Sequence, residues 1–509
     1  MTIRVRRGGA SSAPGRLTAI FSLLVVFSAC HGAPPKIVPP TPSSTRSLQL
    51  QRTIEGVLAE PELAHGTWGI AVKSLSDDQT IYALNPRKLL MPASTMKVVT
   101  LAVAAEKLGW DYRYPTRVLT VGTIEGGVLN GDLLIVGSGD PSLDDWDGAA
   151  TAVFDRWAAL LKERGIRTIG GRIVGDDNAF DDDGLGTGWA WDDLGASYAT
   201  SVGGLQYNEN TARLMVAPGP AAGEPASVAT QTEAAQLTLR NLVQTLPPGS
   251  PTSLQVRLLP LSSTLELRGT VPMDVRPFAR NTSVPNPTLY FANAVRLGLA
   301  RNGIDVIGKA VDIDDLHDPP SREGAQLVTE ELSAPLSQLA TTMMTFSQNL
   351  YAETLLKTLG LGVQRAGSSE AGREAVRVAL ERWNVSTGDI LMVDGSGLSR
   401  YNLITPSAMV SVLSHVFRDD RLRGRFLETL PSAGDGTLAN RMKSTPAAGN
   451  VRAKTGSFSN ARALAGYVRT ADDEPLAFAI FANNYGVESS VIDSATDSII
   501  VALAQFSRR

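Results

Sequence analysis

Hydrophobic residues near the start of the chain's globular part recur first with a helical spacing and then in strand-like runs. Apolar residues between positions 48 and 58 have the spacing of an amphipathic helix. Two runs at 68–74 and 80–84 are rich in aromatic and β-branched residues, and a polar segment at 76–79 separates them. The pattern predicts a helix followed by a β-hairpin.

A long middle part alternates short apolar runs with Gly, Asp and Pro clusters. Strands are predicted at 117–121, 131–136, 168–174 and 212–216, with a helix at 149–164. Residues 227–269 predict further strands and a helix near 234–243. We interpret 113–284 as a strand-rich insertion of two subdomains, the inner one at about 215–272.

Helical spacing returns at 290–300, 336–361 and 371–383, followed by three strand-like runs at 450–453, 463–469 and 476–482 and a closing helix at 490–506. Three strands, or one early hairpin, are too few to be stable alone. Joining them gives one antiparallel five-stranded sheet with helices on its faces. The expected fold class is α+β, with a discontinuous domain made of 47–112 and 285–509.

Composition excludes one class of partner. The 509 residues are 43% hydrophobic and 19% charged, which is globular composition with room for more than one core. The formal net charge is -4, and the body of the chain has no long basic run. We therefore expect no nucleic-acid partner.

The N-terminal segment has the features of an export signal. The first fifty residues contain no Asp or Glu, four arginines precede or begin an apolar run at 17–27, and the only cysteine is Cys30. Residues 1–30 are interpreted as a signal peptide and 31–46 as a Pro-rich tether. Two alternatives remain at this stage: lipidation of Cys30, or ordinary cleavage without lipid, since Phe27 replaces the usual Leu. Both place the mature protein in the periplasm.

The segment 91–97 contains Ser94 followed by Lys97, at the start of a helical pattern that runs to Leu108 and stops at Gly109. Residues three apart share a helix face, so the amine of Lys97 can take the hydroxyl proton of Ser94. The alternative is that Ser94 only caps the helix and Lys97 is solvated.

Two further motifs contain residues suited to the same chemistry. Ser347 and Asn349 lie two apart between helical runs, where one can relay a proton and the other hold an amide; a helix cap is the alternative. Lys454, Thr455 and Gly456 offer a positive charge, a hydroxyl and room for a substrate backbone; a surface turn is the alternative.

Together, Ser-x-x-Lys, Ser-x-Asn and Lys-Thr-Gly in this order resemble the motif set of penicillin-binding proteins and serine β-lactamases. The separation of about 250 residues between the first two motifs is similar to that of the class C low-molecular-mass penicillin-binding proteins, the type-four D-alanyl-D-alanine carboxypeptidase/endopeptidase group. The segments 136–141, 175–180, 207–210 and 394–402 are also similar to that family.

The resemblance implies a role for each matching residue. It implies Ser94 as nucleophile, Lys97 as base, and Ser347 and Asn349 as proton relay and amide contact. It implies that the backbone N–H groups of Ser94 and Ser457 form the oxyanion hole. The residues that it implies as substrate contacts are Lys454, Thr455, Gly456, Ser457, Arg400, and Asp176 or Asp177. Ser459 replaces a glutamine often found in relatives, which affects side-chain specificity.

The resemblance thus implies a serine DD-peptidase that cleaves the D-Ala-D-Ala ends, and also D-Ala-diaminopimelate cross-links, of peptidoglycan stem peptides through an acyl-enzyme and is inhibited by β-lactams. A β-lactamase and a non-catalytic, cell-wall-binding lipoprotein are the alternatives. No Gly-x-Ser-x-Gly elbow supports a histidine triad, and the Asp-rich segment 181–184 does not fit a calcium loop. We expect no cofactor and no metal, and membrane contact only through an N-terminal lipid.

Overall fold

The computed structural model describes residues 45–508, except 147, 260–263, 362–363 and 365. The predicted signal peptide, Cys30 and nearly all of the tether lie outside this part. Within it, no helix has both the length and the apolar character needed to cross a membrane.

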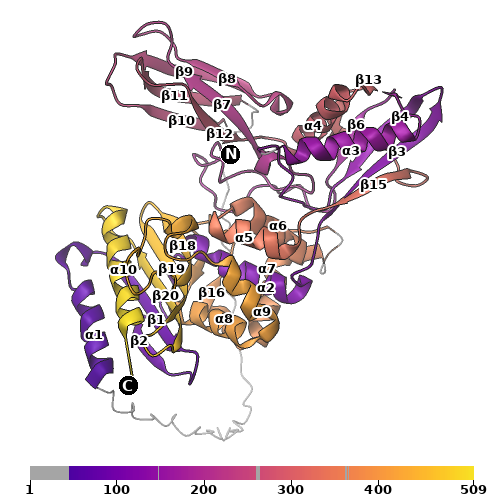
Figure 1. Ribbon diagram of the computed structural model, residues 1–509. Helices are drawn as coiled ribbons and strands as arrows, with labels where there is room; N and C mark the ends of the chain where they lie inside the picture. Colours follow the sequence, from indigo (N-terminus) through magenta and orange to yellow (C-terminus); the bar gives the residue numbers. More distant parts are fainter. Residues whose placement is uncertain (1–44, 147, 260–263, 362–363, 365, 509) are drawn as a thin grey trace, which may run out of the picture. The chain divides into compact units, whose positions relative to one another are not determined.

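A five-stranded antiparallel sheet joins the two ends of the described chain (Figure 1). Its order is β18-β19-β20-β1-β2. The strands are β1 (Thr67–Ser74), β2 (Thr80–Leu84), β18 (Arg452–Phe458), β19 (Ala461–Arg469) and β20 (Pro475–Asn483). β1 pairs with β20 over its whole length, so the early hairpin and the three late strands form one sheet. This confirms the predicted fold class.

Helices cover both faces of this sheet because the central strands are apolar on both sides. On one face, α1 (Thr45–Leu58) and α10 (Ser489–Gln505) pack through a core that includes Ile54, Phe478 and Ile499. On the other face, α2 (Met96–Leu108) and α8 (Pro406–Arg418) pack through a core that includes Val99, Leu413 and Phe481. Figure 1 shows α10 against the sheet, with α1 beside it.

The second core is enlarged by further helices that the apolar spacing predicted only in part. These are α5 (Leu336–Thr345), α6 (Asn349–Leu361), α7 (Ser369–Arg382) and α9 (Asp420–Thr429), with a two-stranded sheet of β16 (Ile390–Leu391) and β17 (Leu403–Ile404). Ser347 has a φ of 62° at the break between α5 and α6. The break lies where the sequence predicted a connection between two helical runs.

The insertion is larger than predicted. Its seven-stranded sheet contains β3 (Pro115–Glu125), β4 (Val128–Val136), β5 (Thr168–Ile169), β6 (Ile173–Asp176), β13 (Asp305–Val306), β14 (Ala310–Asp312) and β15 (Gln326–Leu332). The helices α3 (Ala149–Glu163) and α4 (Pro287–Arg301) share its core. The boundary predicted at 285 is therefore wrong, because α4 and β13–β15 pack with the insertion up to Leu332.

An inner subdomain has its own small core, which includes Leu214, Val243 and Leu267. Two three-stranded sheets form it from β7 (Thr211–Ala217), β8 (Ser227–Thr230), β9 (Thr238–Leu246), β10 (Ser253–Leu258), β11 (Thr264–Pro272) and β12 (Phe278–Ser283). The helix predicted near 234–243 is wrong, since β9 pairs in parallel with β11 there. Cross-strand pairing overrides the local helical spacing at this position.

Three carboxylates meet in the insertion and should destabilise it at neutral pH. One oxygen from each of Asp177, Asp312 and Asp314 lies within 4.8 Å of the others. Burial, followed by the charges of Asp312 and Asp314, raises the pKa of Asp177 to about 6. Asp177 Oδ1 is also buried without a hydrogen-bond partner among the described residues.

Asp177→Asn should therefore stabilise the protein in a pH-dependent way. The folded chain holds the Asp177 proton up to pH about 6, whereas an unfolded Asp loses it near pH 4, so stability falls as pH rises through this window. We expect the free energy of unfolding of the variant to exceed that of the unsubstituted protein by about 1 kcal/mol at pH 8 and to equal it at pH 4. Urea unfolding with a chelator present measures this, and exposed Asp111→Asn is the control. An equal gain at both pH values would contradict the electrostatic explanation.

Candidate active site

Ser94 lies in a tight turn pressed between two other segments. The 3-10 turn η2 (Ala93–Thr95) precedes α2, and Thr95 Oγ1 donates to Pro92 O (2.8 Å). A Cβ on Gly397 would approach Ala93 O to 1.9 Å, and a Cβ on Gly456 would approach Pro92 O to 2.4 Å. Both glycines are therefore required for the loop and the strand β18 to pack against the turn that presents Ser94.

Lys97 is the second residue of α2, is fully buried and contacts three groups. Its Nζ lies 3.0 Å from Ser94 Oγ, 2.6 Å from Asn349 Oδ1 and 2.7 Å from Ser396 O. Asn349 Nδ2 donates to Tyr198 O (2.8 Å), which turns its Oδ1 toward Lys97. Asn349 Oδ1 and Ser396 O can only accept hydrogen bonds. A neutral amine has two N–H donors for them and one lone pair left for the Ser94 hydroxyl.

The electrostatics of the site favour this neutral form. Burial lowers the pKa of Lys97 to about 7, although the charges of Glu353 and Asp394 act in the opposite direction. Lys454 is also fully buried, and burial together with the charge of Lys97 lowers its pKa well below the ordinary value. Near pH 7 neutral and protonated forms of Lys97 therefore coexist.

Ser94 opens into a cavity of about 540 Å³, which two of the predicted substrate contacts, Arg400 and Ser457, also line. Ser347, Asn349, Arg400 and Ser457 line it. Lys454 is buried instead, and its Nζ donates to Thr455 O (3.0 Å). It lies on β18, two residues before Gly456, and it is not among the residues that line the cavity.

The acidic residue predicted to contact substrate is placed elsewhere. Asp176 is 1% exposed and its carboxylate is bound by the guanidinium of Arg322, so the prediction for Asp176 is not supported by its position. Asp193 lines the Ser94 cavity in its place, with Tyr198 OH donating to its Oδ1 (2.6 Å). Its position in the long irregular segment between β6 and β7 explains why periodicity could not identify it.

Three aromatic or cationic side chains complete the cavity. Arg400 stacks over Phe458 with 4.6 Å from its Cζ to the ring centre, and its Nη1 donates to Asn460 Oδ1 (3.0 Å). Arg462 and Asp193 also line the cavity, so groups of both charges face it. Such a cavity suits a ligand that carries both an ammonium and a carboxylate.

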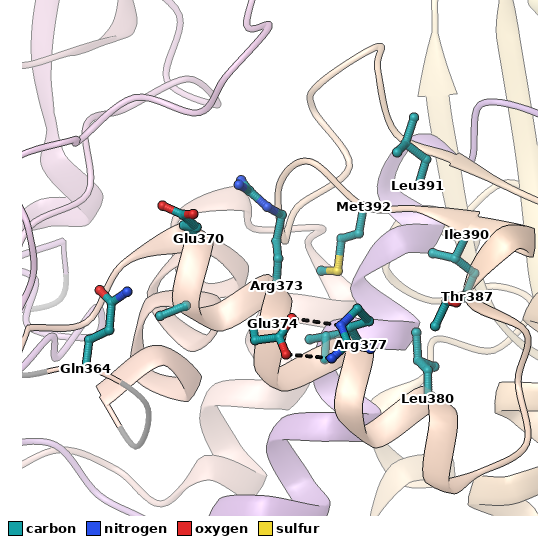
Figure 2. Close-up of a pocket in the computed structure, with 12 residues that line it drawn as sticks. Gln364, Glu370, Arg373, Glu374, Arg377, Leu380, Thr387, Ile390, Leu391 and Met392 are labelled. Carbon is teal, nitrogen blue, oxygen red and sulfur yellow. Dashed lines mark hydrogen bonds and ion pairs between the residues drawn. The ribbon is translucent and has the colours of Figure 1, made fainter.

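A second hollow, of about 470 Å³, lies between α7 and residues 387–392 (Figure 2). Figure 2 shows Glu374 paired with Arg377 along its floor, with Met392 on the facing segment. Arg373, which also lines it, donates through Nη1 to Val393 O (2.9 Å). Its lining contains no serine or lysine, so it lacks the groups needed for acyl transfer.

Comparison with known proteins agrees with this geometry. The model of the D-Ala-D-Ala carboxypeptidase 3 (S13) family matches residues 50–506. The chain belongs to this family. The predicted resemblance to type-four penicillin-binding proteins is confirmed at that level.

Two relatives and one solved structure show how far the similarity extends. The chain is 31% identical to a D-alanyl-D-alanine carboxypeptidase of Actinomadura sp. (strain R39), covering 99% of this chain and 93% of the relative. It is 30% identical to D-alanyl-D-alanine carboxypeptidase DacB of Haemophilus influenzae, covering 86% and 89%. The crystal structure of penicillin binding protein 4 from Haemophilus influenzae matches with a TM-score of 0.78 and 27% identity, over 91% of this chain and all (100%) of that one.

Proposed function

We propose that this S13-family protein is a serine DD-peptidase that acts through an ester on Ser94. The observation that carries the proposal is the set of three contacts around Lys97 Nζ, which fits a neutral amine with its lone pair on the Ser94 hydroxyl. The relatives named as D-alanyl-D-alanine carboxypeptidases support the same substrate class.

The reaction follows from these contacts. Ser94 Oγ attacks the carbonyl carbon of the penultimate D-Ala while Lys97 Nζ takes the hydroxyl proton. The peptide C–N bond then breaks, and the leaving amine receives the proton held by Lys97 by way of Ser347. Water attacks the ester while the neutral Lys97 accepts its proton, and the C–Oγ bond breaks as Lys97 returns this proton to Ser94 Oγ. The backbone N–H groups of Ser94 and Ser457 stabilise the oxyanion at both stages.

Binding of the substrate's ends is assigned to the remaining cavity residues. The Asn349 amide, held by Lys97 and Tyr198, faces the peptide backbone. The terminal carboxylate is bound by Thr455, Gly456 and Ser457 on β18. Lys454 on the same strand supplies positive charge. A carboxylate arriving there favours the charged form of Lys454 and offsets its burial.

The pH dependence of acylation should report the ionisation of Lys97. Below its pKa of about 7 the amine is protonated and cannot accept the Ser94 proton, so the rate should rise tenfold per pH unit below pH 7 and level off above it. Acylation by a fluorescent penicillin from pH 5 to 9 measures this. An acidic limb near pH 10, the value for an exposed lysine, would contradict Lys97 as the base.

The opposite charges in the cavity extend the proposal to cross-links that contain diaminopimelate. Its side chain ends in an ammonium and a carboxylate, which Asp193 and Arg400 can bind. This favours endopeptidase cleavage of D-Ala-diaminopimelate bonds beside the carboxypeptidase reaction.

Asp193→Asn tests this extension. The variant should lower kcat/KM by about 10- to 100-fold for a stem peptide with a free side-chain ammonium, and by less than about 3-fold for the same peptide acetylated there. Exposed Asp192→Asn is the matched control on the neighbouring residue. Equal losses on both peptides would contradict a contact between Asp193 and the ammonium.

Export and location are also proposals. Two of the similar proteins are named as a D-alanyl-D-alanine carboxypeptidase and a penicillin binding protein of Haemophilus influenzae, and these names support a periplasmic location. The signal peptide and the lipidation of Cys30 remain predictions, because residues 1–44 lie outside the described part of the chain.

A further inference from the structure

A buried carboxylate lies one helical turn beyond Asn349. Glu353 on α6 is 3% exposed, and its two oxygens each accept one backbone hydrogen bond, from Gly395 N (3.0 Å) and Ser396 N (2.7 Å). Residues four apart share one helix face, so Asn349 and Glu353 point the same way. Both hydrogen bonds come from backbone N–H groups, and neither comes from a cation. Its burial is therefore costly and calls for a functional explanation.

Glu353 is connected to the catalytic lysine through a single residue. It binds the N–H of Ser396, and the carbonyl of Ser396 accepts from Lys97 Nζ (2.7 Å). The face of α6 thus holds Lys97 twice, directly through Asn349 Oδ1 and indirectly through the Ser396 carbonyl. A movement of Ser396 would leave one N–H of Lys97 without an acceptor.

The loop that contains Ser396 is held by a second buried carboxylate. Asp394 accepts from Gly397 N (2.8 Å), Ser399 N (2.6 Å), Asn402 Nδ2 (2.7 Å) and Trp189 Nε1 (2.9 Å). The same loop packs against the turn of Ser94, where a Cβ on Gly397 would lie 1.9 Å from Ala93 O. Displacing the loop would therefore disturb both the base and the nucleophile.

Lys97 and the three ionisable residues around it consist of two lysines and two acidic residues. Lys454 faces it from β18, Glu353 from α6 and Asp394 from the loop. The negative charges of Glu353 and Asp394 raise the pKa of Lys97, against the effect of burial. Burial and the charge of Asp394 raise the pKa of Glu353 to about 7, so Glu353 and Lys97 titrate in the same range.

We propose that Glu353 is a positioning residue that holds the Ser396 carbonyl against Lys97 and whose negative charge sets the pH at which Lys97 becomes a base. The inference rests on the proposed function, since it assumes that Lys97 activates Ser94. Geometry and charge are separate parts of this role. A variant can remove either one.

Two substitutions separate the parts, with acylation of the full chain by a fluorescent penicillin measured from pH 5 to 10. Glu353→Gln removes the charge and one of the two N–H acceptors, so the plateau rate should fall at least ~10-fold and the acidic limb should move down by at least ~0.5 pH units. Glu353→Asp keeps the charge but is one methylene shorter. It should lower the plateau by ~10-fold while the limb stays within ~0.2 units of the unsubstituted protein.

Glu106→Gln is the matched control, because it makes the same change on α2, where the carboxylate pairs with Arg382. Its limb and plateau should not change. If the acidic limb of the pH–rate profile does not move in Glu353→Gln, or moves by the same amount in Glu353→Asp, the role of the charge is overturned. A full plateau in Glu353→Asp would overturn the positioning role, even if Glu353→Gln fails to fold. Failure of the proposed function differs from both, because the unsubstituted protein would then show no acylation of Ser94.

Discussion

Replacing Lys97 with alanine is expected to slow acylation of Ser94 by at least ~10³, the range over which a general base contributes when it also activates a nucleophile. The amine is 3.0 Å from Ser94 Oγ, and no other ionisable group contacts that hydroxyl in the described chain. Without it, the hydroxyl proton would have to pass to bulk water. The second-order rate of labelling by a fluorescent penicillin at pH 8 measures the change.

Two companion variants make this result interpretable. Lys107→Ala removes an exposed lysine from the last turn of the same helix and should acylate at the normal rate. Lys97→Met keeps most of the buried volume without the amine, and it should be as slow as Lys97→Ala with a smaller loss of stability. A Lys97 variant that folds and retains more than about a tenth of the normal rate would show that another group is the base.

The second large effect concerns Ser94 itself. Ser94→Ala should reduce hydrolysis of a D-Ala-D-Ala peptide to the rate without enzyme, because the covalent intermediate cannot form. Its thermal transition should change little, because the deletion removes one hydroxyl that faces the cavity. Release of D-Ala measures the activity, and exposed Ser411→Ala on α8 is the control. If Ser94→Ala hydrolyses the peptide at more than about 1% of the normal rate, a Ser94 ester is excluded.

Local spacing predicted one contact of the candidate site. Ser94 and Lys97 lie three residues apart where a helix begins, and this spacing alone brings their side chains together. The need to pair strand edges predicted that the early hairpin and the three late strands share one sheet, and in the structure β20 lies beside β1. These features depend on short-range geometry or on elementary rules of sheet formation.

Features that depend on tertiary packing could not be predicted in this way. Glu353 occupies a helical position where a glutamate is ordinarily solvated, and only the fold turns it toward Ser396. Asp193 lies in an irregular segment, so no periodicity indicates which way it faces. The end of the insertion at Leu332 was missed because β15 is a short amphipathic strand whose partner, β3, lies far away in sequence.

The position of Lys454 illustrates the same limit. Its place in Lys-Thr-Gly predicted a charge presented to the substrate, whereas the structure buries the side chain and bonds its Nζ to Thr455 O. Ala453 and Lys454 are both buried although they point to opposite faces of β18, so alternation along the strand does not predict the exposure of Lys454. A sequence pattern identifies the residue types of a site more readily than their exposure.

The most direct test of the Ser94 ester is intact-mass measurement after brief exposure to penicillin, followed by peptide mapping. The account predicts one penicilloyl adduct, located on Ser94, that is absent from Ser94→Ala and that disappears slowly. Adduct loss within seconds would indicate a β-lactamase instead. An adduct mapped to any other residue, or labelling that survives in Ser94→Ala, would contradict the central claim.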